Sequence, residues 1–238
     1  VKIPRKMWLT RRLVTAKHGF VPSDYPRMFS IVAPDCYNCG ELVAAWSERS
    51  SMIFPCDDCG AIQLIPKDVS YFDLFSLTPA ILLDAEKLKK RFRDMQTLLH
   101  PDKFARGSVA EKEVSAENSA LVNVAYQTLR RPLTRVRYVL LSKGINALSE
   151  KNGTAGMDPM LLMEIMELRE QVEGLKSKEE LEEMHAQTQE TLNAIMEALA
   201  QSLTDKDTQR LTDQAIRLQY FSKVDEEIEA MIEKVPFT

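Results

Sequence analysis

The four cysteines of this chain lie in two units of the same form, "CYNCG" and "CDDCG", with 16 residues between Cys39 and Cys56. Two residues between paired cysteines allow both sulfurs to reach one tetrahedral metal ion. The glycine after each pair lets the backbone turn around that ion. The spacing therefore predicts a structural zinc site, with iron as the second candidate metal, held by Cys36, Cys39, Cys56 and Cys59.

Two other roles for these cysteines are weaker. A thioredoxin-type redox centre needs one reactive pair, and two pairs of equal form disfavour it. A zinc ribbon can also bind nucleic acid, but few basic residues flank this one, so we expect no nucleic-acid partner. A module of residues 31–66 is too small to fold on a hydrophobic core alone, and bound metal would supply its stability.

The second chemical signature is the tripeptide His100-Pro101-Asp102, in "TLLHPDKFARG". A hydrolase would use His100 as a base oriented by Asp102, but no nucleophile motif or second titratable cluster supports such a site. A histidine at this place can also be an ordinary polar loop residue. Because Pro101 excludes the α region for the residue before it, a helix must end near His100. We therefore expect a turn between two helices, and no enzyme.

Charge is distributed unevenly along the chain. Residues 70–144 hold 13 Lys and Arg against 8 Asp and Glu, whereas residues 145–238 hold 9 against 20. A basic middle and an acidic tail indicate two surfaces for two partners, or else two solvated helical faces. Residues 1–30 are basic, with no acid before Asp24, and resemble a mitochondrial presequence; a disordered basic arm is the alternative. No apolar run is long enough to cross a bilayer, so we expect no membrane partner.

Periodic apolar residues from position 70 onward predict a mainly α-helical fold. Near the cysteines, Leu42-Val43 and residues 61–65 form short β-type runs instead. The glycine-containing stretch 152–156 is expected to separate two domains. The expected helices cover residues 71–75, 84–99, 109–130, 132–144, 158–174, 178–203 and 206–234.

Each long helix carries an apolar stripe that should face a core. In the helix before the tripeptide the stripe is Leu88, Phe92, Met95 and Leu99, and the exposed faces carry Lys87, Lys89, Lys90 and Arg91. In the helix after it the inward residues are Val114, Leu121, Ala125 and Leu129.

The first helix of the tail is unusual because it carries two apolar rows. One row is a core stripe of Leu161, Ile165, Leu168, Val172 and Leu175. The other lies on a second face and comprises Leu162, Met163 and Met166, continued by Glu167 and Glu170. The second row is either part of a wide core face or a Met-rich surface that binds a partner.

The order of an aromatic short helix, a basic helix, His-Pro-Asp and an amphipathic helix closely resembles a J-domain. The matching stretches are "YFDLF", "LKKRF", "HPDKF" and "VNVAYQTL", within residues 70–135. The resemblance implies a DnaK-type ATPase chaperone as partner, whose ATP hydrolysis the domain stimulates. It also implies the contact residues: His100, Pro101, Asp102, Lys87, Lys89, Lys90 and Arg91.

A tetracysteine module, a J-domain and a three-helix tail in this order resemble the animal form of the HscB family of iron–sulfur cluster co-chaperones, over roughly residues 34–236. The resemblance implies a second partner, a cluster scaffold of the IscU type. The implied scaffold-binding residues are Leu162, Met163, Met166, Glu167, Glu170 and Tyr220. A further acidic position of the family surface falls on Gly174, and Glu173 would have to replace it.

Together these features predict a mainly α protein. A basic leader over 1–30 precedes a small tetracysteine, zinc-ribbon-like module over 31–66, a four-helix J-domain over 70–144 and a C-terminal three-helix bundle over 157–236. The expected function is delivery of an IscU-type scaffold to a mitochondrial DnaK-type chaperone, promoting cluster transfer. The expected location is the mitochondrial matrix, and a cytoplasmic pool is the second location considered. A homodimer is a further expected partner state. The alternative function is a general J-protein co-chaperone for unfolded clients.

Overall fold

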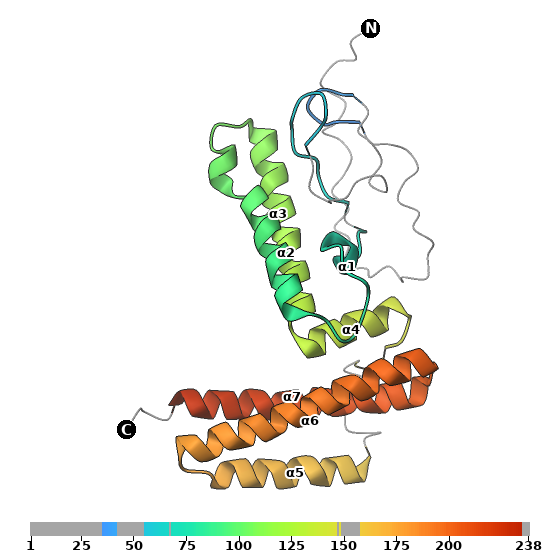
Figure 1. The fold of residues 1–238 in the computed structure, drawn as a ribbon, viewed down its shortest axis with the longest axis vertical. Coiled ribbons are helices and arrows are strands. Elements are labelled where there is room, and N and C mark those ends of the chain that lie inside the picture. Colours follow the sequence, from blue (N-terminus) through green and yellow to red (C-terminus); the bar gives the residue numbers. More distant parts are fainter. Residues whose placement is uncertain (1–34, 42–54, 67, 147, 149–157, 235–238) are drawn as a thin grey trace.

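The computed structural model describes residues 35–41, 55–66, 68–146, 148 and 158–234. Over these residues the chain is mainly helical, which confirms the predicted fold class (Figure 1). The expected leader at 1–30, the run Leu42-Val43 and the stretch 152–156 lie outside the described residues. None of the helices described combines the length and the hydropathy that a membrane span requires.

The first helical unit is a hairpin with two shorter helices packed against it. Its long helices are α2 (Ala85–Leu98) and α3 (Val109–Arg130), joined through the 3-10 turn η2 (Pro101–Phe104). The flanking helices are α1 (Tyr71–Leu74) and α4 (Pro132–Ser142), and both contact α3. Helix α4 lies at the open end of the hairpin, its base, and η2 lies at the tip, where the two long helices are joined (Figure 1).

Local capping fixes the ends of this hairpin. The Asp84 carboxylate accepts a hydrogen bond from the Lys87 amide at 2.9 Å and caps α2. Ser108 and Glu111 form a reciprocal capping box that starts α3. The Asp84 cap therefore lies at the base of the hairpin, and the Ser108–Glu111 box lies beside the tip, where it fixes the start of α3.

The buried face of α3 differs from the predicted stripe. Ala125 and Leu129 are buried as expected, but Val114 and Leu121 are only half-buried. Two polar residues take the inner positions, because they satisfy backbone groups of nearby loops. Ser115 donates to the Leu99 carbonyl at 3.1 Å. Asn118 hydrogen-bonds to the backbone of Gln63 and Ile65, in the segment that contains the second cysteine pair. Because Ser115 and Asn118 are polar, the sequence pattern placed them on the solvent side of the helix.

The expected β-type run at 61–65 does not form a strand in the described residues. It makes a single bridge, between Ile62 and Pro55. The amide of Ile65 donates to the Asn118 side chain at 2.9 Å, so a helix side chain satisfies this backbone in place of a neighbouring strand.

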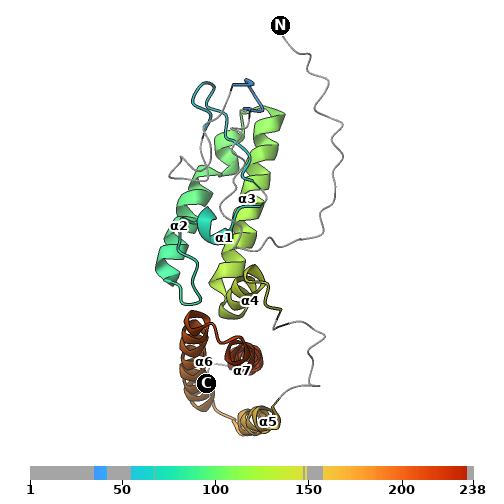
Figure 2. The same ribbon diagram turned by 90° about the vertical axis from the view of Figure 1, so that its right-hand side faces the viewer.

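The second helical unit is a bundle of α5 (Pro159–Gly174), α6 (Lys178–Asp205) and α7 (Thr208–Lys234). Helices α6 and α7 form a long antiparallel pair, and α5 packs on α7 (Figures 1 and 2). Helix α6 ends at Asp205, two residues beyond the predicted 203, where Lys206 adopts a left-handed φ of 58°. The core of the bundle is mostly apolar and includes Leu161, Ile165, Leu181, Leu199, Leu211, Leu218 and Ile228; the polar residues Thr188, Ser202 and Asp225 are also buried in it.

The two helical units meet where α4 contacts α7. The α2–α3 hairpin stands across the long axis of the bundle (Figure 1). In both views η2 and α5 lie at opposite ends of the molecule (Figures 1 and 2). The two surfaces that the sequence singled out are therefore far apart in the fold.

Candidate functional site

The two Cys-x-x-Cys-Gly units fold into matching turns. In the first, Cys36 N–H donates to the Glu41 carbonyl at 2.8 Å and Gly40 N–H donates to the Cys36 carbonyl at 2.9 Å. The second unit repeats both bonds with the same lengths. Gly40 and Gly60 have φ values of 79° and 73°, a region that side chains rarely enter, which explains the glycine in each unit.

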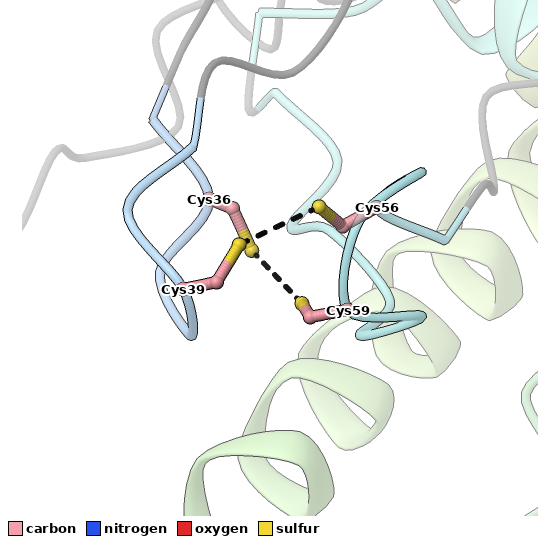
Figure 3. Close-up of side chains that lie close together, drawn as sticks. All are labelled: Cys36, Cys39, Cys56 and Cys59. Carbon is pink, nitrogen blue, oxygen red and sulfur yellow. Dashed lines mark hydrogen bonds between the residues drawn. The ribbon is translucent and has the colours of Figure 1, made fainter.

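These turns bring all four sulfur atoms together (Figure 3). The Sγ atoms of Cys36 and Cys59 lie 3.6 Å apart, and those of Cys39 and Cys56 lie 3.7 Å apart. Both distances are too long for a disulfide, in which the sulfurs are about 2.05 Å apart. Around a tetrahedral zinc ion with bonds of about 2.3 Å, sulfurs lie roughly 3.8 Å apart. The predicted ligands thus form a cluster that could hold a metal ion.

The electrostatics of the cluster favour a bound cation. Burial raises the pKa of Cys36, but hydrogen bonds from the backbone at Cys39 and Asn38 and from neighbouring thiols lower that pKa to about 6. For Cys39 a backbone hydrogen bond from Glu41 lowers the pKa, yet desolvation and the other three thiols raise it to about 12. One thiolate therefore forms readily and the next is opposed by it. A divalent cation would relieve this repulsion.

The His-Pro-Asp tripeptide forms the exposed tip of the hairpin. His100 precedes η2, and its Nδ1 accepts a hydrogen bond from the Asp102 amide at 3.4 Å. The Asp102 carboxylate lies 3.5 Å from the same nitrogen. The side chains of His100 and Asp102 are 60% and 91% exposed, so both present polar atoms to solvent. Pro101 occupies the first turn of η2 and fixes their relative placement.

Three of the four predicted basic residues on α2 are exposed: Lys87, Lys90 and Arg91. Lys89 is half-buried, and its Nζ lies 3.9 Å from the Glu86 carboxylate. An exposed contact of this length contributes little to stability, but it partly neutralises the charge of Lys89. The exposed cations lie on the helix that leads into the tip.

The second apolar row of α5 lies on the protein surface. Leu162, Met163 and Met166 are 43%, 56% and 55% exposed, and Glu167 and Glu170 are also exposed. Leu161, Ile165 and Val172 are buried instead, so the alternative of one wide core face is wrong. Met160, on the same helix, is 71% exposed and was not among the residues that the sequence assigned to this row. Its i, i+3 spacing with Met163 is the signal that could have found it.

Ion pairs fix the face that α5 presents. Arg217 on α7 binds the Glu164 carboxylate through two nitrogens, each at 2.9 Å, and Arg169 binds Glu227 at 2.7 Å. Such a two-pronged contact restricts rotation of α5 on α7. Tyr220, the predicted aromatic on α7, is half-buried, with the Lys223 ammonium 5.7 Å from its ring centre. It offers less surface than the apolar row on α5.

Comparison with known proteins adds a consistent set of relatives. The family model described as HSCB C-terminal oligomerisation domain matches residues 157–229. The iron–sulfur cluster co-chaperone protein HscB of Mus musculus is 32% identical over 197 residues, which covers 83% of this chain and 82% of the mouse protein.

Solved structures agree with these sequence relatives. The crystal structure of human co-chaperone protein HscB superposes with a TM-score of 0.73 at 30% identity, covering 86% of this chain and 100% of the human one. Chaperone HscB from Vibrio cholerae gives a TM-score of 0.59 at 30% identity, covering 71% of this chain and 100% of the bacterial one.

Proposed function

Since this chain belongs to the HscB family of iron–sulfur cluster co-chaperones and carries the four-cysteine cluster of the animal form, we propose that it delivers an IscU-type scaffold to a DnaK-type chaperone. It also stimulates ATP hydrolysis by that chaperone, and the coupled cycle promotes cluster transfer. In this proposal the iron–sulfur cluster is cargo, held by the scaffold. The chain itself is an adaptor without catalytic residues.

The observation that carries this proposal is the placement of two exposed surfaces of opposite character. The tip His100-Pro101-Asp102 lies at one end of the molecule, and the Met-rich row of α5 lies at the other, while the basic residues occupy the first half of α2, toward the base of the hairpin. Two large partners can then be bound at once without collision. A protein that only stimulated a chaperone would need the first surface alone.

The tip and α2 form the proposed chaperone-binding surface. Residues 70–144 carry a net excess of basic groups, so an acidic face on the chaperone would be steered toward them. His100, Pro101 and Asp102 then engage the chaperone at a fixed angle, and Lys87, Lys89, Lys90 and Arg91 supply the surrounding charge. Because exposed charges are screened within about 8 Å at physiological ionic strength, stimulation should weaken as salt rises.

The apolar row of α5 forms the proposed scaffold-binding surface. Burying the exposed apolar area of Leu162, Met163 or Met166 against a partner would contribute roughly 1–2 kcal/mol of binding free energy for each side chain. Methionine side chains also adapt to irregular partner surfaces. Glu167, Glu170 and Tyr220 form the polar and aromatic rim. Because Gly174 carries no acid, Glu173 is the proposed substitute at the edge of this surface.

The four-cysteine module is proposed to be a structural zinc site. Four thiolates with tetrahedral spacing fit zinc, and iron is the less favoured ion. The cysteines leave no open position for a substrate, so the bound ion would hold the two turns together and supply no chemistry. The proposed domains are the module at 31–66, the J-domain at 70–144 and the scaffold-binding bundle at 157–236.

We also propose a mitochondrial matrix location, on the basic composition of residues 1–30, with room for a cytoplasmic pool. Self-association is a further proposal, supported by the match of residues 157–229 to the HSCB C-terminal oligomerisation domain. Sedimentation of the purified chain over a range of concentrations would test it, and a concentration-independent monomer would contradict it.

One mixing experiment tests the main proposal. The purified chain is combined with a DnaK-type chaperone, ATP and an IscU-type scaffold, and both ATP turnover and scaffold comigration are measured. We expect turnover to rise with the chain and to rise further when the scaffold is present. If unrelated unfolded chains are bound and the scaffold is not, the general J-protein alternative replaces this proposal.

A further inference from the structure

Three metal-ligating side chains converge in the bundle, away from the four cysteines. His185 comes from α6, and Asp225 and Glu229 come from α7, four residues apart and so on one face of that helix. The His185 Nε2 lies 3.4 Å from Asp225 Oδ1 and 3.5 Å from Glu229 Oε1. The three candidate ligand atoms all lie within 4.8 Å of one another.

These distances suit a shared ion better than direct hydrogen bonds. An N–H···O hydrogen bond is usually about 2.7–3.2 Å long, and both N···O distances here are longer. Around a tetrahedral zinc ion with bonds of roughly 2.0–2.1 Å, neighbouring ligand atoms lie about 3.3–3.4 Å apart. The spacing of His185 to both carboxylates is close to that value.

The state of Asp225 is a second and independent observation. Asp225 is 8% exposed, and its Oδ1 is buried without a hydrogen-bond partner. The other oxygen, Oδ2, accepts a hydrogen bond from Gln189 Nε2 at 2.6 Å, which aims Oδ1 at His185. A buried carboxylate oxygen is costly without a cation or donor.

We propose that His185, Asp225 and Glu229 bind a divalent transition-metal ion of the zinc type. One imidazole nitrogen and two carboxylate oxygens are a ligand set that zinc accepts, and water would complete the tetrahedron. The ion can enter from solvent, because the Glu229 side chain is 59% exposed. Gln189 acts as an outer partner that orients Asp225.

This ion would join the early part of α6 to the late part of α7, which are far apart in sequence. It is separate from the four-cysteine cluster in ligand chemistry, since it uses nitrogen and oxygen instead of sulfur. The inference does not depend on the proposed co-chaperone cycle, and either can fail without the other.

Metal stoichiometry of the full chain tests the site. After equilibrium dialysis against zinc, we expect two zinc ions per chain by atomic emission, one for the cysteines and one for the bundle. His185→Gln and Glu229→Gln should each reduce this to one, while Glu197→Gln, an exposed carboxylate change on α6, should leave two. The Glu229 side chain is mostly exposed, so Glu229→Gln should fold and keeps the test valid if His185→Gln does not fold.

Cobalt(II) identifies the ligands of the second ion. A thiolate site gives strong sulfur-to-cobalt absorption in the near ultraviolet, whereas the bundle site should add only weak visible bands. Gln189→Met should weaken binding of the second ion about 10–100-fold without abolishing it. A wild-type chain that binds one zinc while its cobalt form shows the thiolate absorption, or a second zinc retained by His185→Gln and Glu229→Gln, would overturn the site in favour of a simple His185 ion pair.

Discussion

The side-chain amide of Asn118 on α3 donates a hydrogen bond of 2.9 Å to the backbone carbonyl of Gln63, next to the second cysteine turn. The same side chain accepts from the Ile65 amide at 2.9 Å. Gln63 in turn donates to Cys36 Sγ at 3.3 Å. A continuous chain of buried polar contacts thus links the four-cysteine cluster to the core helix of the hairpin.

Replacing Asn118 with alanine should loosen this link. The Gln63 carbonyl and the Ile65 amide would each lose a buried partner, at a cost of about 1–3 kcal/mol apiece. Urea unfolding should show the loss of stability, and hydrogen exchange at the Ile65 amide should accelerate. Gln127→Ala, on the exposed face of α3, should stay within about 0.5 kcal/mol of wild type. Equal stability of both variants would contradict the link.

Removing one metal ligand should affect the cysteine segment selectively. Cys36→Ser is expected to release one equivalent of metal, because the hydroxyl is a poor replacement for a thiolate. Hydrogen exchange should then accelerate in residues 35–41 and 55–66 and stay unchanged in α6 and α7, which belong to the separate helical bundle. Chelator treatment of wild type should give the same pattern at the cysteines. Retained metal would show that the cysteines are not the ligands.

The start of α6 provides a pH test. Hydrogen bonds from the Ser177 and Lys176 backbone to the Glu180 carboxylate hold the pKa of Glu180 below its ordinary value of 4.5. Since the folded state favours the ionised form, its stabilising contribution is complete above pH 4.5 and is lost as pH falls through the lower folded pKa. The stability difference between wild type and Glu180→Gln, from urea unfolding, should therefore shrink below pH 4.5. A difference independent of pH would contradict the capping role.

Helix positions were predictable because their signals are local. Asp84 caps α2, and Pro101 ends it, and both follow from rules about neighbouring residues. The cysteine ligands were predictable for the same reason, since a repeated spacing points to one tetrahedral ion. The end of α6 was not predictable, because Lys206 adopts a left-handed backbone conformation that glycine usually occupies.

Features that depend on distant residues could not be read from the sequence. Asn118 is buried because its partner Gln63, 55 positions away, folds against it, and periodicity alone places a polar residue outside. The same holds for His185 and Asp225, which meet only when α6 and α7 pair. The sequence could not decide which of the two apolar rows of α5 faces solvent. The packing of α5 on α7 decides it, because it buries one row and leaves the other exposed.

His100→Gln should abolish stimulation of the chaperone's ATPase. The imidazole is exposed at the tip and makes only weak contacts within the chain, so its loss removes a partner contact without disturbing the fold. Steady-state ATP turnover with a DnaK-type chaperone measures this, and the thermal unfolding midpoint should stay unchanged. Scaffold comigration should persist. Loss of both activities in a folded variant would argue against two separate surfaces.

The double change Leu162→Ala and Met166→Ala should weaken scaffold binding while leaving ATPase stimulation by the chain alone intact. Both side chains are about half exposed, so their truncation removes contact area from a partner and little from the core. We expect a loss of roughly 1–3 kcal/mol in binding, or about 5–150-fold in the dissociation constant, measured by titration calorimetry with an IscU-type scaffold. Leu161→Ala, one residue away but buried, should instead lower the unfolding midpoint, because it leaves a cavity between α5 and the rest of the bundle. If the double variant melts early while binding the scaffold normally, these residues stabilise the bundle and the scaffold must bind elsewhere.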